Sequence, residues 1–348
     1  MKYSTLEANL EENRRHILPI WARNLRPVVA SEESKFDWNY QENPAGPGRC
    51  WLLQEADRFV GTAGLGLRRF KVLDEVVTAG LLADFAVDEA HRNFFGALML
   101  QRRVREALDS GLGFLYSAPL RTSASVQLRL GHVKLGEMER YVKILDSRPY
   151  LQRVLGRWPG AGVIAPTMNA ILRALQRENW SIGEKFVVKR MEEFDSRFDA
   201  LWERAAPAFA VTGERTSRFL RWRYTRFPGS KHCTVGLLSE NEENLSGYVI
   251  FTVEGSVISI ADLFFDEPNK SLTNLLVGFL RFVSGEGATS VSFSFLGTEE
   301  IKRKLKVFGF YPRNDRMDVL IAVGAKNQPS PVVLNPSQWY LVPGDQEY

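Results

Sequence analysis

Residues 80–100 read GLLADFAVDEAHRNFFGALML. The apolar run 81–87 is interrupted only by Asp84, which is typical of a buried strand, and a polar turn follows over 88–93. The small residues 96–97 then begin a helical pattern. The first turn of a helix carries unpaired N–H groups and the positive end of the helix dipole. A strand, a turn and a helix start in this order therefore indicate a place where a phosphate group can bind.

Length and composition bound the domain number and the class of the protein. Its 348 residues exceed the length of an ordinary domain, so two domains are expected. A hydrophobic content of 45% with 11% aromatic residues predicts a globular protein with substantial cores. The two cysteines, Cys50 and Cys233, lack the close spacing of a disulfide framework or a zinc motif, and the four histidines lack metal-ligand spacing. We therefore expect no bound metal.

Positive charge is concentrated in one part of the sequence. Residues 90–160 contain twelve Lys or Arg against five Asp or Glu, although the net charge of the whole chain is only +4. Such a cluster forms either a solvated basic surface or a site for a polyanionic ligand, whose local concentration it raises. Nucleic acid would also suit a pI near 9.0, but the chain has no RNP-like, zinc-finger or helix-turn-helix signature. Nucleic acid is therefore not expected as a partner.

An internal repeat organises the chain. The pattern Trp-x-Tyr-x-x-x-Pro at residues 38–44 recurs with the same spacing at 222–228. The segment 83–89 is echoed in the same order at 261–267, at nearly the same offset. Blocks that recur in one order at a nearly constant offset predict two copies of one α/β unit. The second copy lacks an arginine with a small-residue turn behind it, so a cofactor is expected only in the first copy.

The repeat suggests a division of the chain into four parts. These are an N-terminal domain (1–146), a helical connector (147–185), a degenerate C-terminal domain (186–325) and an irregular tail (326–348). Within the connector, the basic and apolar residues of 148–177 suit either a peripheral membrane contact or packing against both halves, and we favour packing. The polar start of the chain and the lack of a long apolar run predict a cytoplasmic protein.

The stretch that begins at Gly80 resembles the acetyl-CoA-binding core of the GNAT acyltransferase superfamily. In that superfamily the turn reads Arg or Gln, two residues, Gly, one residue, then Gly or Ala. Arg92 and Ala97 match this pattern, whereas Phe95 stands at the first glycine position and Gly96 falls one place late. The tandem order also resembles bacterial GNAT proteins linked to polysaccharide and amino-sugar acylation, and FemAB-like transferases. The fold that this implies is α/β, with two tandem GNAT-like domains, each a mixed, mostly antiparallel sheet flanked by helices.

The resemblance also implies a cofactor site and a reaction. The amine of an acceptor would attack the thioester of acetyl-CoA directly, without an acyl-enzyme. Backbone groups would line the pantetheine at Phe85, Ala86 and Val87. The pyrophosphate would be surrounded by Arg92, Asn93, Phe94, Phe95, Gly96 and Ala97. The Pro-Asn step that many members carry after the second strand is absent, because Leu120 follows Pro119.

Four residues are candidates for chemistry or acceptor binding. Asp84 is the candidate base, with a structural carboxylate as the alternative, which its echo at Asp262 favours. Tyr116 is the candidate proton donor for the departing thiolate, with core packing as the alternative. Trp38 and Tyr40 suit an acceptor pocket for a sugar, but their repetition in the second copy favours packing.

The leading functional expectation is acyl-CoA-dependent N-acyl transfer, with acetyl as the acyl group and an amino sugar or nucleotide sugar as the acceptor. One alternative is a non-catalytic binding protein of the same fold, which Phe95 supports. Another is aminoacyl transfer from a charged tRNA, as in FemAB-like proteins, for which the basic region would bind RNA. The sequence leaves the acceptor, the acyl chain and the oligomeric state open.

Overall fold

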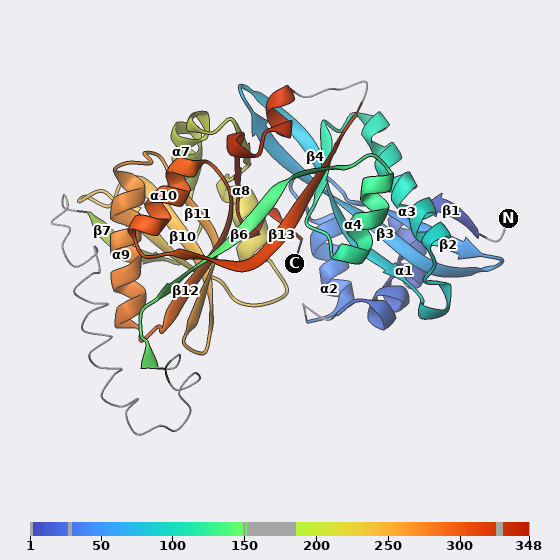
Figure 1. Ribbon diagram of the computed structural model, residues 1–348, viewed down its shortest axis with the longest axis horizontal. Helices are drawn as coiled ribbons and strands as arrows, with labels where there is room; N and C mark the ends of the chain where they lie inside the picture. Colours follow the sequence, from blue (N-terminus) through green and yellow to red (C-terminus); the bar gives the residue numbers. More distant parts are fainter. Residues whose placement is uncertain (1–2, 27–29, 149–150, 152–185, 325–329, 348) are drawn as a thin grey trace.

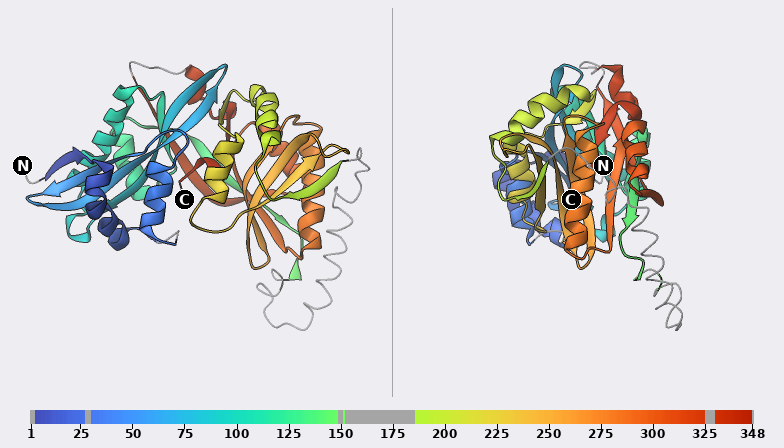
Figure 2. Two further views of the ribbon diagram at one scale, coloured as in Figure 1. Left: turned by 180° about the vertical axis from the view of Figure 1, so that it is seen from behind. Right: turned by 90° about the vertical axis from the view of Figure 1, so that its left-hand side faces the viewer.

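The computed structural model describes residues 3–26, 30–148, 151, 186–324 and 330–347. The connector predicted at 147–185, with the segment 148–177 considered for membrane contact, lies almost entirely outside these residues. Two lobes of sheet and helix lie side by side, and long strands cross between them (Figure 1). The last described residues lie between the lobes. Figure 2 shows the same arrangement from behind.

The first half carries the strand and helix pattern expected around Gly80. Its elements are β1 (Tyr3–Glu7), α1 (Leu10–Asn24), α2 (Glu32–Phe36), β2 (Arg49–Glu55), β3 (Arg58–Val72), β4 (Glu75–Val87), α3 (Phe94–Glu106), β5 (Phe114–Ser117), α4 (Arg121–Arg129) and β6 (Val133–Ile144). The core strand β4 ends at Val87 because the polar turn follows it. Helix α3 begins at Phe94 because the side chain of Asn93 accepts the N–H of Gly96 at 2.9 Å and so caps the helix.

The second half repeats this order of elements, with one strand added between its first two helices and another added after its last long strand. Its elements are β7 (Val187–Met191), α7 (Ser196–Ala205), β8 (Val211–Gly213), α8 (Ser217–Leu220), β9 (Cys233–Leu238), β10 (Leu245–Glu254), β11 (Val257–Phe265), α9 (Ser271–Gly285), β12 (Ser290–Gly297), α10 (Glu299–Val307), β13 (Tyr311–Val323) and β14 (Trp339–Leu341). Helix α9 is apolar on most of its surface and lies buried against the sheet, as Leu272, Leu276 and Leu280 show with 0% exposure.

The described strands form one 14-stranded sheet, in which twelve strands follow the order β1-β2-β3-β4-β5-β13-β6-β12-β11-β10-β9-β7. Strands β4 and β5 are parallel, as are β11 and β12, and most other neighbours are antiparallel. Strands β6 and β13 are exchanged between the halves: β13 pairs with β5, and β6 pairs with β12. Strands β8 and β14 also link β3 to β12, so part of the sheet closes into a circuit. The predicted α/β class is confirmed, and the boundaries at 146 and 186 stay a prediction because the halves share strands.

The repeated tryptophans, one from each half, contact each other. Trp38 lies in a single turn of π-helix, Asp37–Gln41, and Trp222 lies in its counterpart, Arg221–Thr225. Their rings stack with centroids 4.6 Å apart and planes 7° apart. Each indole N–H donates to the carbonyl of the other tryptophan, at 2.8 and 2.7 Å. This reciprocal contact favours the interpretation of the chain as two copies of one unit.

Candidate functional site

The candidate site is a cavity where β4 and β5 separate. The two parallel strands pair only at Gly80 with Leu115 and at Leu81 with Tyr116, and beyond this point they diverge. A cavity of about 330 Å³ occupies the resulting space between the strands and the helices that follow them. Its lining includes Leu82, Asp84, Gln101, Ser117, Gln346 and Glu347. Diverging parallel strands of this kind expose backbone groups that no neighbouring strand pairs with.

A bulge at Asp84 directs one of these backbone groups into the cavity. Ala83 pairs with Gly64 and Ala86 pairs with Thr62, so one position of β4 has no counterpart on β3. Asp84 adopts φ = +50°, which a residue with a side chain rarely does. Its carbonyl accepts the hydroxyl of Thr62 at 3.0 Å. The bulge therefore leaves the N–H of Asp84 free of the sheet ladder.

The side chain of Asp84 is committed to two partners. The carboxylate is fully buried and accepts the Lys35 amine at 2.5 Å and the Tyr40 hydroxyl at 2.7 Å. Burial alone would lower the pKa of Lys35, but the carboxylates of Asp84 and Glu347 outweigh it and raise that pKa. Burial raises the pKa of Tyr40, so its hydroxyl keeps its proton. This geometry favours the structural interpretation of Asp84, and its role as base stays a prediction.

The C-terminal tail places a second carboxylate, that of Glu347, at the cavity. The side chain of Glu347 accepts the backbone N–H of Asp84 at 2.9 Å and lies 3.6 Å from the Lys35 amine. Burial, followed by the nearby charge of Asp84, raises the pKa of Glu347 to about 7. About a third of the side chain is exposed, at 37%. Glu347 therefore combines access to the cavity with a pKa suited to proton transfer near neutral pH.

Gln101 offers a second polar group to a ligand. It lies on α3, is 2% exposed and lines the cavity. Among the described residues its Oε1 atom meets no hydrogen-bond donor. Buried polar atoms are nearly always paired, so this oxygen suits an N–H group of a molecule bound in the cavity.

Tyr116, the predicted proton donor, is placed away from the cavity lining. It is 1% exposed, and its ring packs against Phe70 and Phe114. Its hydroxyl donates to the carbonyl of Asp345 at 2.6 Å, and burial raises its pKa. The hydroxyl is therefore committed to holding the tail, which favours the packing interpretation, and the donor role stays a prediction.

The predicted pyrophosphate turn is largely occupied by contacts within the protein. The Nε of Arg92 donates to the carbonyl of Val87 and its guanidinium donates to the Asn24 side chain, both at 3.0 Å. Asn93 caps α3 as described above. Gly96 faces the sheet, because a Cβ there would lie 3.0 Å from a methyl of Leu53. The glycine therefore allows close helix packing against β2.

The other predicted cofactor positions are divided between the cavity and the sheet. Phe85 lines the cavity, whereas Ala86 and Val87 are buried and pair with β3. Phe94 and Phe95 are exposed, at 45% and 52%, and Ala97 is half-buried. Of the predicted cofactor positions, Phe85 alone lines the cavity.

The predicted acceptor residues lie in the core. Trp38 is 5% exposed in its stack with Trp222, and Tyr40 is fully buried with its hydroxyl on Asp84. The packing interpretation is therefore favoured for both, and a contact between either ring and an acceptor stays a prediction. Glu347 was missed because nothing in the local sequence of the tail indicates that it reaches β4.

The corresponding space in the second half is filled by the chain itself. Strands β11 and β12 are paired up to Ile260 and Phe293. Beyond that point the tail strand β14 pairs with β12 at Leu341 and Leu296, and the Tyr340 hydroxyl donates to the carbonyl of Leu263. The tail therefore occupies the position that the cavity has in the first half.

Two further kinds of site were sought in the described part of the chain. No group of three or more His, Cys, Asp or Glu residues is placed to hold a metal ion there. No described helix is long and apolar enough to span a membrane.

The sequence itself matches no family model, and no curated protein matches it. Solved structures do match. A conserved protein of unknown function from Enterococcus faecalis V583, described as a probable N-acyltransferase, has a TM-score of 0.68 at 10% identity over 93% of this chain and 73% of its own. A GCN5-related N-acetyltransferase from Anabaena variabilis has a TM-score of 0.65 at 13% identity, over 92% and 72%. N-myristoyltransferase of Saccharomyces cerevisiae, solved with myristoyl-CoA bound, has 0.56 at 9% identity, over 94% and 80%. The chain therefore has the fold of the GNAT N-acyltransferases.

Proposed function

We propose that the protein is an acyl-CoA-dependent N-acyltransferase whose reaction takes place in the cavity between β4 and β5. The observation that carries this proposal is the pairing of a bulge N–H, on Asp84, with a carboxylate of raised pKa, on Glu347, in one cavity. The likeness in fold to GNAT N-acyltransferases supports the reaction class. We further infer that the chain is a tandem GNAT form, with a second half that no longer binds a cofactor.

The cavity suits the pantetheine arm of the acyl donor. Its volume of about 330 Å³ accommodates an extended arm but not the whole nucleotide, which would lie outside at the mouth. The unpaired Oε1 of Gln101 can accept an amide N–H of that arm. The N–H of Asp84 can donate to the thioester carbonyl oxygen, on which negative charge develops as the amine attacks. Donor binding would therefore displace Glu347 from that N–H.

The displaced carboxylate has a role in the reaction. The neutral amine attacks the carbonyl carbon, the C–N bond forms and the C–S bond breaks. Glu347 accepts the proton that the nitrogen loses and returns it to the departing sulfur, so that the amide and the thiol both leave neutral. This route needs no hydroxyl donor, which agrees with the commitment of Tyr116 to the tail. It also leaves the contact between Asp84 and Lys35 in place.

The finer identity of the substrates is part of the proposal. We propose acetyl-CoA as the donor and an amine on a sugar or nucleotide sugar as the acceptor, as the resemblance implies, in the cytoplasm where acyl-CoA is available. A second candidate function is a binding protein without catalysis. It is favoured by one observation, which is that Arg92 and Asn93 are already bound to the protein rather than presented to a phosphate.

A binding titration tests the proposal. Ser123 lines the cavity from α4, so tryptophan at this position would fill the space between the strands. Ser125 is exposed on the same helix and lies outside the cavity lining, so Ser125→Trp is the matched control. We expect calorimetric binding of acetyl-CoA to the wild type and to Ser125→Trp, and its loss in Ser123→Trp. Equal binding by all three proteins would place the donor elsewhere, and no binding by the wild type would overturn the proposal.

A further inference from the structure

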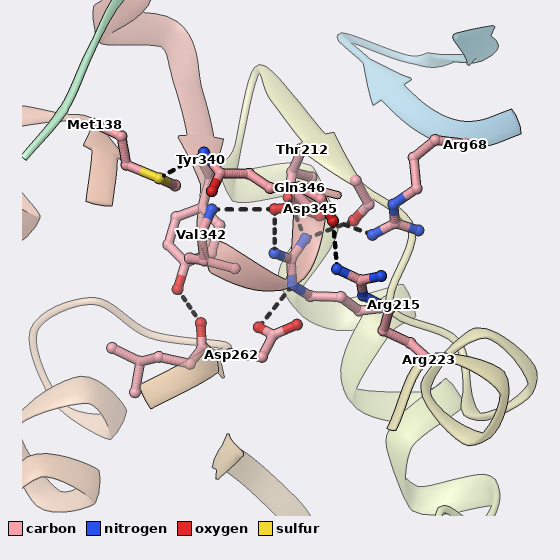
Figure 3. Close-up of polar contacts among 12 residues, drawn as sticks. Arg68, Met138, Thr212, Arg215, Arg223, Asp262, Tyr340, Val342, Asp345 and Gln346 are labelled. Carbon is pink, nitrogen blue, oxygen red and sulfur yellow. Dashed lines mark hydrogen bonds and ion pairs between the residues drawn. The ribbon is translucent and has the colours of Figure 1, made fainter. Parts of the chain in front are cut away.

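The C-terminal tail is anchored by a buried charge two residues before Glu347. The carboxylate of Asp345 has 0% of its surface exposed and accepts the guanidinium groups of Arg68 and Arg215, each at 2.7 Å. It also accepts the backbone N–H of Val342 at 3.2 Å, which closes the turn (Figure 3). An aspartate with this many charged partners is fixed in position.

Arg215 connects this anchor to the second half. It is fully buried and bridges Asp345 to Asp262, at 2.7 and 3.0 Å, and it donates to the carbonyl of Gly213 at 2.7 Å. Two arginines and two aspartates therefore share the site, and their formal charges cancel. Removing charges from water is costly unless they are paired in this way.

Asp262 corresponds to Asp84 in the repeat, and the surroundings correspond as well. Each carboxylate accepts the tyrosine hydroxyl of its own repeated motif, from Tyr40 at 2.7 Å and from Tyr224 at 3.0 Å. Each is also paired with a cation, Lys35 for Asp84 and Arg215 for Asp262. In the second half, however, the tail fills the space between the strands. The second half thus binds the tail where the first half has its cavity.

The anchor limits where Glu347 can lie. Two residues of extended chain span at most roughly 7 Å, so a fixed Asp345 confines Glu347 to the neighbourhood of β4. Two more contacts hold the intervening backbone. The Tyr116 hydroxyl donates to the carbonyl of Asp345 at 2.6 Å, and the Arg223 guanidinium donates to the carbonyl of Gln346. Both halves therefore contribute to the position of the Glu347 carboxylate.

We infer that Asp345 and Arg215 are positioning residues for acyl transfer. The second half binds the tail between its own strands, and the bound tail places Glu347 in the first-half site. This inference rests on the proposed function, because Glu347 must take part in the reaction for its position to matter. The second half would thus contribute to catalysis by positioning Glu347, without binding a substrate itself.

A double-mutant cycle tests the inference. The variants are Asp345→Asn, Glu347→Gln and the pair together, assayed for kcat and for acetyl-CoA affinity. We expect Asp345→Asn to lower kcat by about 100-fold, the effect of a catalytic group displaced by about 1 Å, while the Kd of acetyl-CoA is kept. In the Glu347→Gln background the same change should alter kcat by less than about 2-fold, because its effect passes through Glu347. An equal loss of kcat in both backgrounds would overturn the inference.

If Asp345→Asn does not fold, an insertion variant tests the same inference. One glycine placed between Asp345 and Gln346 keeps the anchor and its ion pairs but lengthens the connection to Glu347. We expect the insertion to lower kcat while the Tm stays that of the wild type, and an unchanged kcat would overturn the inference. A wild type that binds acetyl-CoA but transfers no acyl group to any amine would overturn the proposed function and this inference together. An active wild type with an additive cycle would overturn the inference alone.

Discussion

Arg215→Met removes the central cation of the buried network and keeps a side chain of similar length. It breaks the ion pairs to Asp262 at 3.0 Å and to Asp345 at 2.7 Å. Removal of one partner leaves buried charge uncompensated, which costs about 3–5 kcal/mol. Asp345 keeps Arg68 at 2.7 Å, whereas Asp262 keeps the Tyr224 hydroxyl at 3.0 Å, so the cost falls mainly on Asp262. We therefore expect the free energy of unfolding to fall by an amount within that range.

Chemical denaturation at neutral pH measures the loss. The control is Arg140→Met, because the ion pair of Arg140 with Asp315 is 2.5 Å long but its side chains are 43% and 63% exposed. Water screens exposed pairs and leaves them with little effect on stability, so this variant should unfold close to the wild type. Similar small losses in both variants would refute the claim that the tail is held by buried charge.

The pH dependence of unfolding provides a check on the same network. Burial would raise the pKa of Asp345, but Arg215 and Arg68 outweigh it and hold that pKa below its usual value near 3.8. A carboxyl whose pKa is depressed on folding stabilises the fold above its unfolded pKa, and this stabilisation is lost as the pH falls through the folded value. Burial raises the pKa of Asp262, and this pKa would rise further without Arg215, which makes stability fall as the pH rises. Both effects act in one direction, so Arg215→Met should gain less stability than the wild type as the pH rises through the acid range.

Three further predictions concern the site and the core. The kcat of the wild type should rise with pH through about 7, where Glu347 becomes ionised. Glu347→Gln should remove this rise and lower kcat by about 100-fold. A pH–rate series measures both effects, and an unaltered profile would exclude Glu347 as the proton acceptor. Trp38→Ala and Trp222→Ala should each lower the free energy of unfolding by about 3–5 kcal/mol. The two losses should be similar, because the stack and its hydrogen bonds are reciprocal. A small loss for either variant in a denaturant titration would contradict a stabilising stack. His132 is buried, and burial is the main cause that lowers its pKa to about 4. Its stabilising effect is therefore present above pH 6.5 and is lost as the pH falls from 6.5 toward 4. His132→Gln should flatten the plot of unfolding free energy against pH over that interval, and a plot identical to that of the wild type would contradict this assignment.

Local sequence patterns predicted the parts of the fold that depend on local interactions. The apolar run that ends at Val87, the polar turn and the helical pattern after it predicted β4 and α3 from residue order alone. The helix begins at Phe94, two residues before the small residues where the pattern placed its start, because Asn93 caps it. The repeat also identified Trp38 and Trp222 as related positions, which the structure brings into contact. Their burial in a stack favours a packing role.

The remaining features depend on contacts between distant parts of the chain. The exchange of β6 and β13 joins strands whose pairing partners lie in the other half, and no local pattern specifies such a partner. The same holds for Glu347, whose place at Asp84 follows from the anchor at Asp345 and not from its own neighbours in the sequence. The sequence likewise does not predict the free N–H of Asp84 at the bulge, because the bulge arises from the register between β3 and β4.

Release of free thiol from acetyl-CoA in the presence of a panel of amines, with amino sugars included, tests the central proposal most directly. The wild type should release thiol only when an amine that it acylates is present, and Ser123→Trp, which fills the cavity, should release none. Ser125→Trp should behave as the wild type does. Thiol release by Ser123→Trp at the wild-type rate would contradict a reaction between β4 and β5, and an inert wild type that still binds acetyl-CoA would leave the protein a CoA-binding module.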